Sequence, residues 1–299
     1  MIEYADFTKD YDGHRAVDSL SLQLPRGTVV ALLGPNGSGK TTTIKAAAGL
    51  LRPTAGTVRV GEPGLDPLDP EARRRCSFLP QRVSFPDALS GREIVEFYRR
   101  LRGADAEATE RVLKFSALNG SSGRAVRTYS GGMLQRLGLA VAMLPKADIL
   151  LLDERTAALD ADGLCALYEL IDERRRAGAS ILFSSHQLGD IERLADHVAV
   201  LAEGRMVAWV SECELARHLA DRGVMRVRLR AHVPGVLERI KQVAPDASWF
   251  HDELIVPGPA AGRPLALDSI REAGGEISGL TAEDGRLDDL YRELLEARQ

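Results

Sequence analysis

The chain has 299 residues, of which 44% are hydrophobic and 27% are charged, with a formal net charge of −4. This composition excludes pervasive disorder, and the length favours two domains or one large domain. The slightly acidic balance and the aromatic content of 5% argue against nucleic acid as a partner.

The cysteines and the N-terminus both indicate a cytoplasmic protein. Cys76, Cys165 and Cys213 are odd in number and far apart, so we expect reduced thiols without a disulfide. The first residues are acidic where a signal peptide is basic, and the sequence has no run of about 18 apolar residues. We therefore expect any contact with a membrane to depend on a partner.

Apolar runs alternate with helical stretches in the first part of the chain. Residues 28–33 form an unbroken apolar run that predicts a strand buried on both faces. Residues 40–51 predict a helix that ends at Arg52 and Pro53. Further buried strands are predicted at 148–153, 180–184 and 198–201. This alternation predicts an α/β domain with a mainly parallel sheet and helices on both faces.

Residues 86–128 depart from this pattern because they are charged, helix-rich and free of buried-strand runs. Helices are predicted at 92–102 and 106–115. We interpret the segment as a helical subdomain inserted into a first domain that spans residues 1–213.

A second, small α+β domain is predicted over residues 224–299. Residues 225–231 alternate strictly between apolar and polar, which predicts a half-exposed strand. The following elements are predicted in order: helix 236–243, strand 248–256, helix 265–273, strand 276–281 and helix 287–297. We expect an accessory or dimerisation role, and we interpret the row Arg226, Arg228 and Arg230 as a solvated strand face rather than an interaction face.

A phosphate-binding loop is predicted between the first buried strand and the helix after it. The residues fit G-x-x-x-x-G-K-[ST] and continue into a second threonine: Gly34, Pro35, Asn36, Gly37, Ser38, Gly39, Lys40, Thr41 and Thr42. In this pattern glycines let backbone N–H groups point at phosphate oxygens, and the helix N-terminus adds partial positive charge. Lys40 reaches the β- and γ-phosphates, and Thr41 offers a hydroxyl to Mg²⁺. A glycine-rich turn that binds nothing is the weaker reading in this strand–turn–helix context.

Two acidic residues end the buried strand at 148–153. Asp153 emerges at the carboxyl end of that strand, where α/β sheets bind ligands, and it would hold Mg²⁺ through water. Glu154 follows directly and could polarise the attacking water as a catalytic base.

A third motif makes a family recognisable. Ser130, Gly131 and Gly132 precede a helix, and together with the phosphate loop and the acidic pair they resemble the signature of ABC-type ATPases. The resemblance covers about residues 1–213. It implies a P-loop NTPase fold of the ABC type and Mg²⁺-dependent ATP hydrolysis coupled to transport.

The resemblance also implies roles for single residues. Tyr11 would stack on adenine, with a plain surface aromatic as the alternative, and Gln81 would sense the γ-phosphate and contact Mg²⁺. Asp160 resembles the D-loop aspartate that lies near the nucleotide. His186 resembles the catalytic switch histidine. Ser130, Gly131 and Gly132 would bind the ATP held by a second chain.

The partners follow from the same resemblance. Because the chain has one phosphate loop and one signature, it needs a second copy or a related chain to complete two ATP sites. A transmembrane permease would lie against the helical subdomain, which places the protein on the inner face of the membrane.

The subfamily is a finer prediction. Stretches at 86–102, 126–140 and 287–293 resemble the ATPase of the copper-associated ABC transporter for nitrous oxide reductase maturation, which would add a periplasmic partner protein. Drug- or lipid-type exporter ATPases are the alternative. A third interpretation, a catalytically impaired regulatory ATP-binding module, comes from Arg155, which stands where the family has proline after the glutamate. At this position we expect arginine to reduce the turnover of ATP but not to abolish it.

Overall fold

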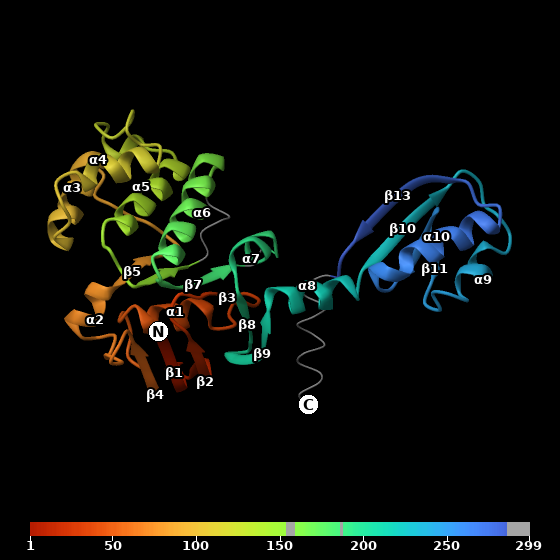
Figure 1. Ribbon diagram of the computed structural model, residues 1–299, viewed down its shortest axis with the longest axis horizontal. Helices are drawn as coiled ribbons and strands as arrows, with labels where there is room; N and C mark the ends of the chain where they lie inside the picture. The colour runs from red at the N-terminus through yellow and green to blue at the C-terminus, as the bar shows by residue number, and fades with distance from the viewer. Residues whose placement is uncertain (154–158, 186–187, 286–299) are drawn as a thin grey trace. The chain divides into compact units, whose positions relative to one another are not determined.

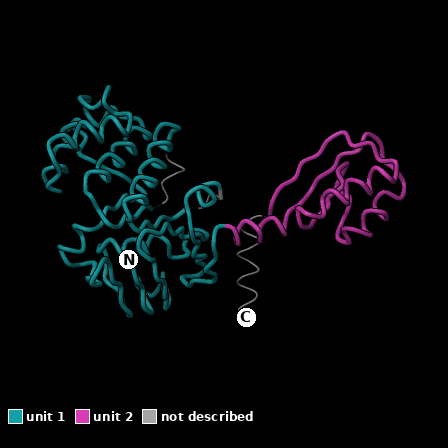
Figure 2. The backbone as a smooth tube through the Cα atoms, viewed as in Figure 1, with its two compact units in different colours: residues 1–212 teal, residues 213–299 magenta. Residues whose placement is uncertain are grey.

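The computed structural model describes residues 1–153, 159–185 and 188–285. The chain divides into two compact units, Met1–Glu212 and Cys213–Gln299, which are coloured separately in Figure 2. The predicted closing helix at 287–297 lies outside the described residues.

A six-stranded sheet forms the centre of the first unit (Figure 1). In spatial order its strands are β5 (Cys76–Leu79), β6 (Ile149–Leu152), β7 (Ser180–Ser185), β3 (Val29–Leu33), β8 (His197–Ala202) and β9 (Arg205–Ser211). All neighbours are parallel except β9, which runs antiparallel to β8. Every residue of β3, β6 and β7 is buried, as the apolar runs predict for central strands of a parallel sheet.

A second, antiparallel sheet was missed by the sequence interpretation, which expected one mainly parallel sheet. Its strands, in the order β2-β1-β4, are β2 (His14–Leu24), β1 (Ile2–Tyr11) and β4 (Ala55–Val60). Register shifts interrupt the pairing of β1 with both of its neighbours, and Asp6 and Ser19 have φ values of 49° and 50°. These irregularities break the two-residue alternation by which a half-buried strand is predicted.

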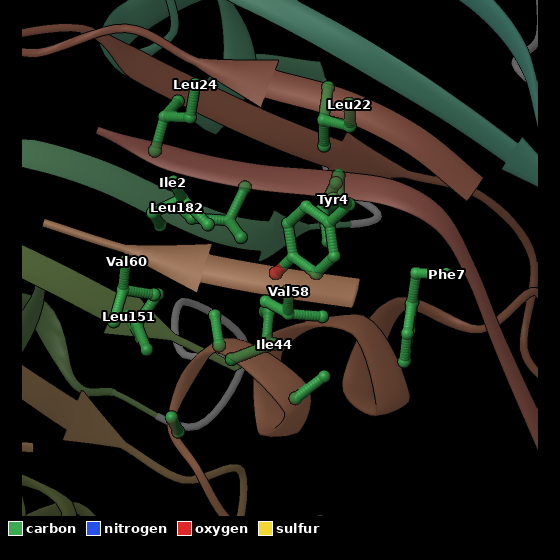
Figure 3. Close-up of a cluster of buried hydrophobic side chains, with 14 of the residues drawn as sticks. Ile2, Tyr4, Phe7, Leu22, Leu24, Ile44, Val58, Val60, Leu151 and Leu182 are labelled. Atoms are coloured by element: carbon green, nitrogen blue, oxygen red, sulfur yellow. The ribbon is translucent and has the colours of Figure 1, made fainter. Parts of the chain in front are cut away.

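The main core of this unit draws on both sheets (Figure 3). Ile2 and Tyr4 of β1 belong to the same buried cluster as Leu151 of β6 and Leu182 of β7. Ile44 adds the helix α1 (Lys40–Ala47), and the Tyr4 hydroxyl donates to the Thr43 carbonyl oxygen at 2.8 Å. Each fully buried aliphatic side chain contributes about 1.5–3 kcal/mol, so this cluster fixes the helix that begins at the phosphate loop.

The helices of this unit fall into two groups (Figure 1). Besides α1, the helices associated with the six-stranded sheet are α2 (Pro70–Arg75), α6 (Ala161–Arg176) and α7 (Leu188–Leu194). The others share a separate apolar cluster and are α3 (Gly91–Arg102), α4 (Ala108–Phe115), η1 (Val126–Thr128) and α5 (Gly131–Met143). Ser90 and Glu93 form a capping box at the start of α3, and Gly103 ends it with φ 65°.

The second unit begins with α8 (Glu212–Ala220), whose first residue belongs to the first unit. It continues with β10 (Val224–Leu229), α9 (Val236–Ile240), β11 (Ser248–Phe250), β12 (Glu253–Pro257), η3 (Ala260–Gly262), α10 (Arg263–Glu272) and β13 (Ile277–Glu283). The sheet order is β11-β12-β10-β13, and all neighbours are antiparallel. This β-α-β-β-α-β succession with that order is the split β-α-β, or ferredoxin-like, arrangement.

One predicted strand of this unit is two strands. Residues 248–256 form β11 and β12, which pair with each other through a turn that contains His251 at φ 53°. The positive φ lies at the turn in the middle of this segment, which the sequence analysis predicted as a single strand.

No helix among the described residues has the length and hydrophobicity that a bilayer span requires.

The three cysteines differ in environment, and their reactivity should differ accordingly. Burial raises the pKa of the Cys76 thiol to about 12, whereas Cys165 and Cys213 are exposed. Because the thiolate is the reactive form, we expect a maleimide at pH 8 to label two thiols of the native protein and all three after denaturation. Intact-protein mass spectrometry over time measures this; rapid labelling of Cys76 in the native protein would contradict the burial.

Candidate functional site

The phosphate loop lies between β3 and α1 and requires glycine at two positions because of close contacts. A side chain at Gly34 would collide with the Leu201 carbonyl oxygen, and a Cβ at Gly39 would lie 2.7 Å from the Ala16 carbonyl oxygen. Gly37 and Gly39 also have φ values of 83° and 101°, in the region that favours glycine. The loop is therefore wedged against β2 and β8, and its backbone curvature is fixed by its surroundings.

Two polar side chains of the loop lie buried beside its backbone. The Lys40 ammonium donates to the carbonyl oxygens of Gly34 at 2.8 Å and Pro35 at 3.0 Å. Ser38 is almost fully buried, and its hydroxyl has no hydrogen-bond partner among the described residues. A buried hydroxyl without a partner is costly, so its position within this loop fits a site that takes up an anion.

The Asp153 carboxylate connects three elements at the carboxyl ends of the parallel strands. Asp153 follows β6 and is 1% exposed. Its Oδ1 accepts from the Thr41 hydroxyl at 3.0 Å and from the Ser184 hydroxyl, at the end of β7, at 3.0 Å. The structure thus brings the predicted pair Thr41 and Asp153 together. Ser184 is a further site residue that sequence reasoning missed, although two serines at the end of a buried strand were a usable signal.

A pocket of about 500 Å³ opens over the loop. It is lined by Tyr11, His14, Ala16, Asn36, Gly37, Gly39, Lys40, Thr41, Thr42 and Gln81. Tyr11 is 43% exposed, and the Lys9 ammonium lies 5.0 Å from the centre of its ring. An exposed aromatic face at the rim of a phosphate-binding pocket can stack on a planar base. His14 and Ala16 line the pocket from β2, and no sequence signal identified them.

The signature residues lie at the start of α5, where Ser130 caps the helix by accepting from the Met133 N–H at 3.2 Å. A Cβ at Gly132 would lie 3.0 Å from Asp160 Oδ2, so the signature and Asp160 are neighbours within one chain. Ser130, Gly131 and Gly132 are not among the described residues that line the pocket over the phosphate loop.

Arg136 holds this second group of residues together and was also missed by sequence reasoning. Its guanidinium lies 3.3 Å from an Asp160 carboxylate oxygen and 3.9 Å from one of Asp162. It also donates to the Ala117 carbonyl oxygen at 3.2 Å. Asp160 in turn caps α6 by accepting from the Gly163 N–H at 3.1 Å.

Both predicted catalytic residues, Glu154 and His186, lie outside the described residues, as does Arg155. A buried carboxylate lies close in sequence to His186: Asp190 accepts from the Ser185 hydroxyl at 3.0 Å and from the Tyr168 hydroxyl at 2.9 Å. Burial, followed by the bond to Asp190, raises the pKa of Tyr168 to about 12. The end of β7 is therefore fixed by two hydroxyl–carboxylate contacts, one to Asp153 and one to Asp190.

Removing the Ser184 hydroxyl should destabilise the first unit. Ser184→Ala leaves the buried Asp153 carboxylate with one partner fewer, so the free energy of unfolding should fall by about 1–3 kcal/mol. Ser21→Ala is the matched control, because the Ser21 hydroxyl also bonds a carboxylate, that of Asp6 at 3.1 Å, but in solvent. The free energies of unfolding of both variants are measured by urea unfolding, followed by Trp209 fluorescence in a Trp249→Phe background. An equal loss of free energy in the two variants would contradict the role of Ser184.

Comparison with known proteins agrees with this geometry. The model of the ABC transporter family matches residues 17–157. The uncharacterized ABC transporter ATP-binding protein YxlF of Bacillus subtilis (strain 168) is 33% identical over 99% of this chain and 100% of its own length. The daunorubicin/doxorubicin resistance ATP-binding protein DrrA of Streptomyces peucetius is 38% identical over 76% of this chain and 70% of its own length.

A solved structure shares the fold. The dimeric structure of MJ0796, described as a bacterial ABC transporter cassette, superposes with a TM-score of 0.65 and 24% identity over 71% of this chain and 99% of that one. The fold class predicted from the sequence, a P-loop NTPase of the ABC type, is confirmed. The chain belongs to the ATP-binding subunits of ABC transporters, a family of ATPases that couple ATP hydrolysis to transport.

Proposed function

We propose that this chain is the ATP-hydrolysing subunit of a membrane exporter for drug- or lipid-like compounds, and that it works on the inner face of the membrane against a transmembrane permease. One observation carries the ATP site. A single pocket combines the phosphate loop with Tyr11 and Gln81, and Thr41 at its edge is bonded to Asp153. Residues that can stack on adenine, bind phosphate and contribute a carboxylate to Mg²⁺ therefore lie close together.

The residues of the pocket fit ATP and Mg²⁺. Phosphate oxygens would accept a hydrogen bond from the Ser38 hydroxyl. The backbone N–H groups of the loop and the Lys40 ammonium would also face the phosphate oxygens. Thr41, Asp153 and Gln81 supply the oxygen atoms that Mg²⁺ prefers. When bound, the ion neutralises charge that develops on the phosphates. Within the chain, Asp153 orients the Thr41 hydroxyl, and we assign Glu154 as the base and His186 as the switch residue.

A complete site needs a second copy of the chain. Ser130, Gly131 and Gly132 do not line the pocket over their own phosphate loop, but lie beside Asp160 and Arg136. A two-fold pair of chains would place each signature on the ATP held by the other, and the dimeric MJ0796 cassette supports such an arrangement. The helical group α3–α5 is the part that we assign to transmitting this motion to the permease.

The cargo class rests on similarity to a drug-resistance ATP-binding protein. DrrA, named for daunorubicin and doxorubicin resistance, is 38% identical over 76% of this chain. The copper-associated system for nitrous oxide reductase maturation, with its periplasmic partner, stays a prediction, since neither relative reported above is named for it. The impaired regulatory module rests on Arg155 alone, a residue outside the described part of the chain.

The Thr41 hydroxyl should be needed for Mg²⁺-dependent turnover. Thr41→Val keeps the shape of the side chain but removes the oxygen that bonds Asp153, so we expect ATP hydrolysis in Mg²⁺ to fall about 10–100-fold. Thr41→Ser retains the hydroxyl and should stay within a few-fold of the parent. Phosphate release at saturating ATP measures the rates. If Thr41→Val hydrolysed ATP as fast as Thr41→Ser, the assignment of this residue to the metal would be wrong.

Cargo can be tested in cells that lack the chain and are complemented with the parent or with Thr41→Val. We expect loss of the chain to raise susceptibility to amphiphilic drugs such as daunorubicin several-fold, and only the parent to restore it. Nitrous oxide reduction should be unaffected. The opposite pattern, with nitrous oxide reduction lost and drug tolerance unchanged, would instead support the copper-associated system.

A further inference from the structure

The strand β13 lies at an edge of the C-terminal sheet and pairs with β10 on one side only. Within the described residues, no strand covers its other side. Proteins commonly protect such edges with proline, lysine or a very short strand. The opposite edge, β11, is protected in this way because it has only three residues. β13 has seven residues, and its sequence ISGLTAE contains neither proline nor a basic residue.

The regular part of β13 defines a register for pairing with another strand. A register shift lies between Arg228 and Leu229, opposite the beginning of β13, while Gly279 to Glu283 pair regularly with β10. If two such segments pair antiparallel around a two-fold axis, the axis passes through the middle residue, Thr281. Gly279 then faces Glu283 of the second copy, and Leu280 faces its Ala282. Threonine opposite threonine is a favourable cross-strand pair.

Charge does not oppose this register. Glu283 meets a glycine rather than another carboxylate. Arg263 lies 3.3 Å from an Asp284 carboxylate oxygen and donates to the Glu283 carbonyl oxygen at 3.2 Å. Arg230 similarly lies 3.2 Å from Glu276, at the other end of the strand. The two carboxylates that flank β13, Asp284 and Glu276, are therefore paired within their own chain, and in this register like charges do not face each other across the pair.

An exposed apolar side chain also favours a partner at this edge. Leu280 is 49% exposed, although Val227, its register partner on β10, is fully buried. With Leu267 and Ile277 it lines a pocket of about 570 Å³ at the side of the sheet. A second β13 would cover Leu280 with Ala282 and part of this surface.

We propose that β13 pairs antiparallel with β13 of a second copy, centred on Thr281, and joins the two C-terminal sheets into one. This inference rests on the proposed pairing of two ATPase units, which brings the second copy into the same complex. Because each C-terminal unit is covalently attached to its ATPase unit, formation of the ATP-bound pair raises the effective concentration of one β13 for the other. The contact is isologous, so it closes at two copies instead of growing into a filament.

Cross-linking through a single cysteine tests the register. In a full-length Cys165→Ser, Cys213→Ser background, Thr281→Cys places the new thiol on the two-fold axis. Directly opposite residues of antiparallel strands have Cα atoms about 4.5–5.5 Å apart, within the range of a disulfide. Glu283→Cys is the matched control. It is exposed on the same strand face, but its two copies would lie four residues apart along the strands, or about 13 Å.

We expect mild oxidation in Mg²⁺ and ATP to convert Thr281→Cys into a covalent dimer at least about ten-fold more completely than Glu283→Cys. No dimer, or equal amounts from both variants, would overturn the inference. Leu280→Lys, a substitution at a half-exposed position, should lower the cross-linked fraction of Thr281→Cys; an unchanged fraction would also count against edge pairing. ATP hydrolysis by the parent is measured separately, and it tests the proposed function. Cross-linking tests the pairing of β13, so the failure of one proposal can be distinguished from the failure of the other.

Discussion

The Asp153 carboxylate is the contact on which the rest of the site depends. A carboxylate that is 1% exposed is stable only if hydrogen bonds replace its water, and here the Thr41 and Ser184 hydroxyls both donate to the same oxygen. These bonds join the end of β6 to the first turn of α1 and the end of β7. The position of the phosphate loop relative to the strand ends is therefore fixed before any ligand binds. The same Thr41 hydroxyl is the one assigned to Mg²⁺, so binding the ion changes the partners of an existing buried contact.

A second polar contact, separate from the first, organises the signature. Arg136 of α5 lies against Asp160, which itself caps α6, and Gly132 leaves room for that carboxylate. The first turn of the signature helix and the first turn of α6 are thus fixed to each other within one chain. Arg136, Asp160 and Gly132 are not among the described residues that line the pocket over the phosphate loop. In the two-chain site proposed above, each chain would contribute two preformed halves of opposite kind. Joining halves from two chains would then need little further ordering, which lowers the cost of association.

Local patterns in the sequence predicted the parts of the fold that depend on nearby residues. The phosphate loop, the buried strands β3, β6 and β7, and the helices α3 and α4 all follow from spacing and apolar runs. The antiparallel sheet of β1, β2 and β4 could not be predicted in this way, because residues such as Asp6 and Ser19 adopt positive φ and shift the alternation. Ser184 and Arg136 were missed for another reason. Their roles depend on which strand and which helix lie beside them, and a local feature such as the pair of serines at the end of β7 does not identify those neighbours.

The C-terminal unit shows how composition and position together decide which surface is available for contacts. The row of arginines on and after β10 suggests a basic surface. The sequence favoured the interpretation that this surface is solvated and does not bind a partner. In the structure Arg228 lies 2.9 Å from Glu253, and Arg230 lies 3.2 Å from Glu276. These exposed pairs contribute little stability, but they cancel the local charge and remove the attraction for an anionic partner. The surface that remains for contacts is the edge at β13, which no described strand covers and which carries the exposed Leu280. Backbone hydrogen bonds along an edge accept any extended segment, so specificity must come from side chains. When β13 pairs antiparallel with β13 of a second copy, centred on Thr281, no like charges face each other. The side chains of β13 can therefore supply that specificity for a second copy of the same chain.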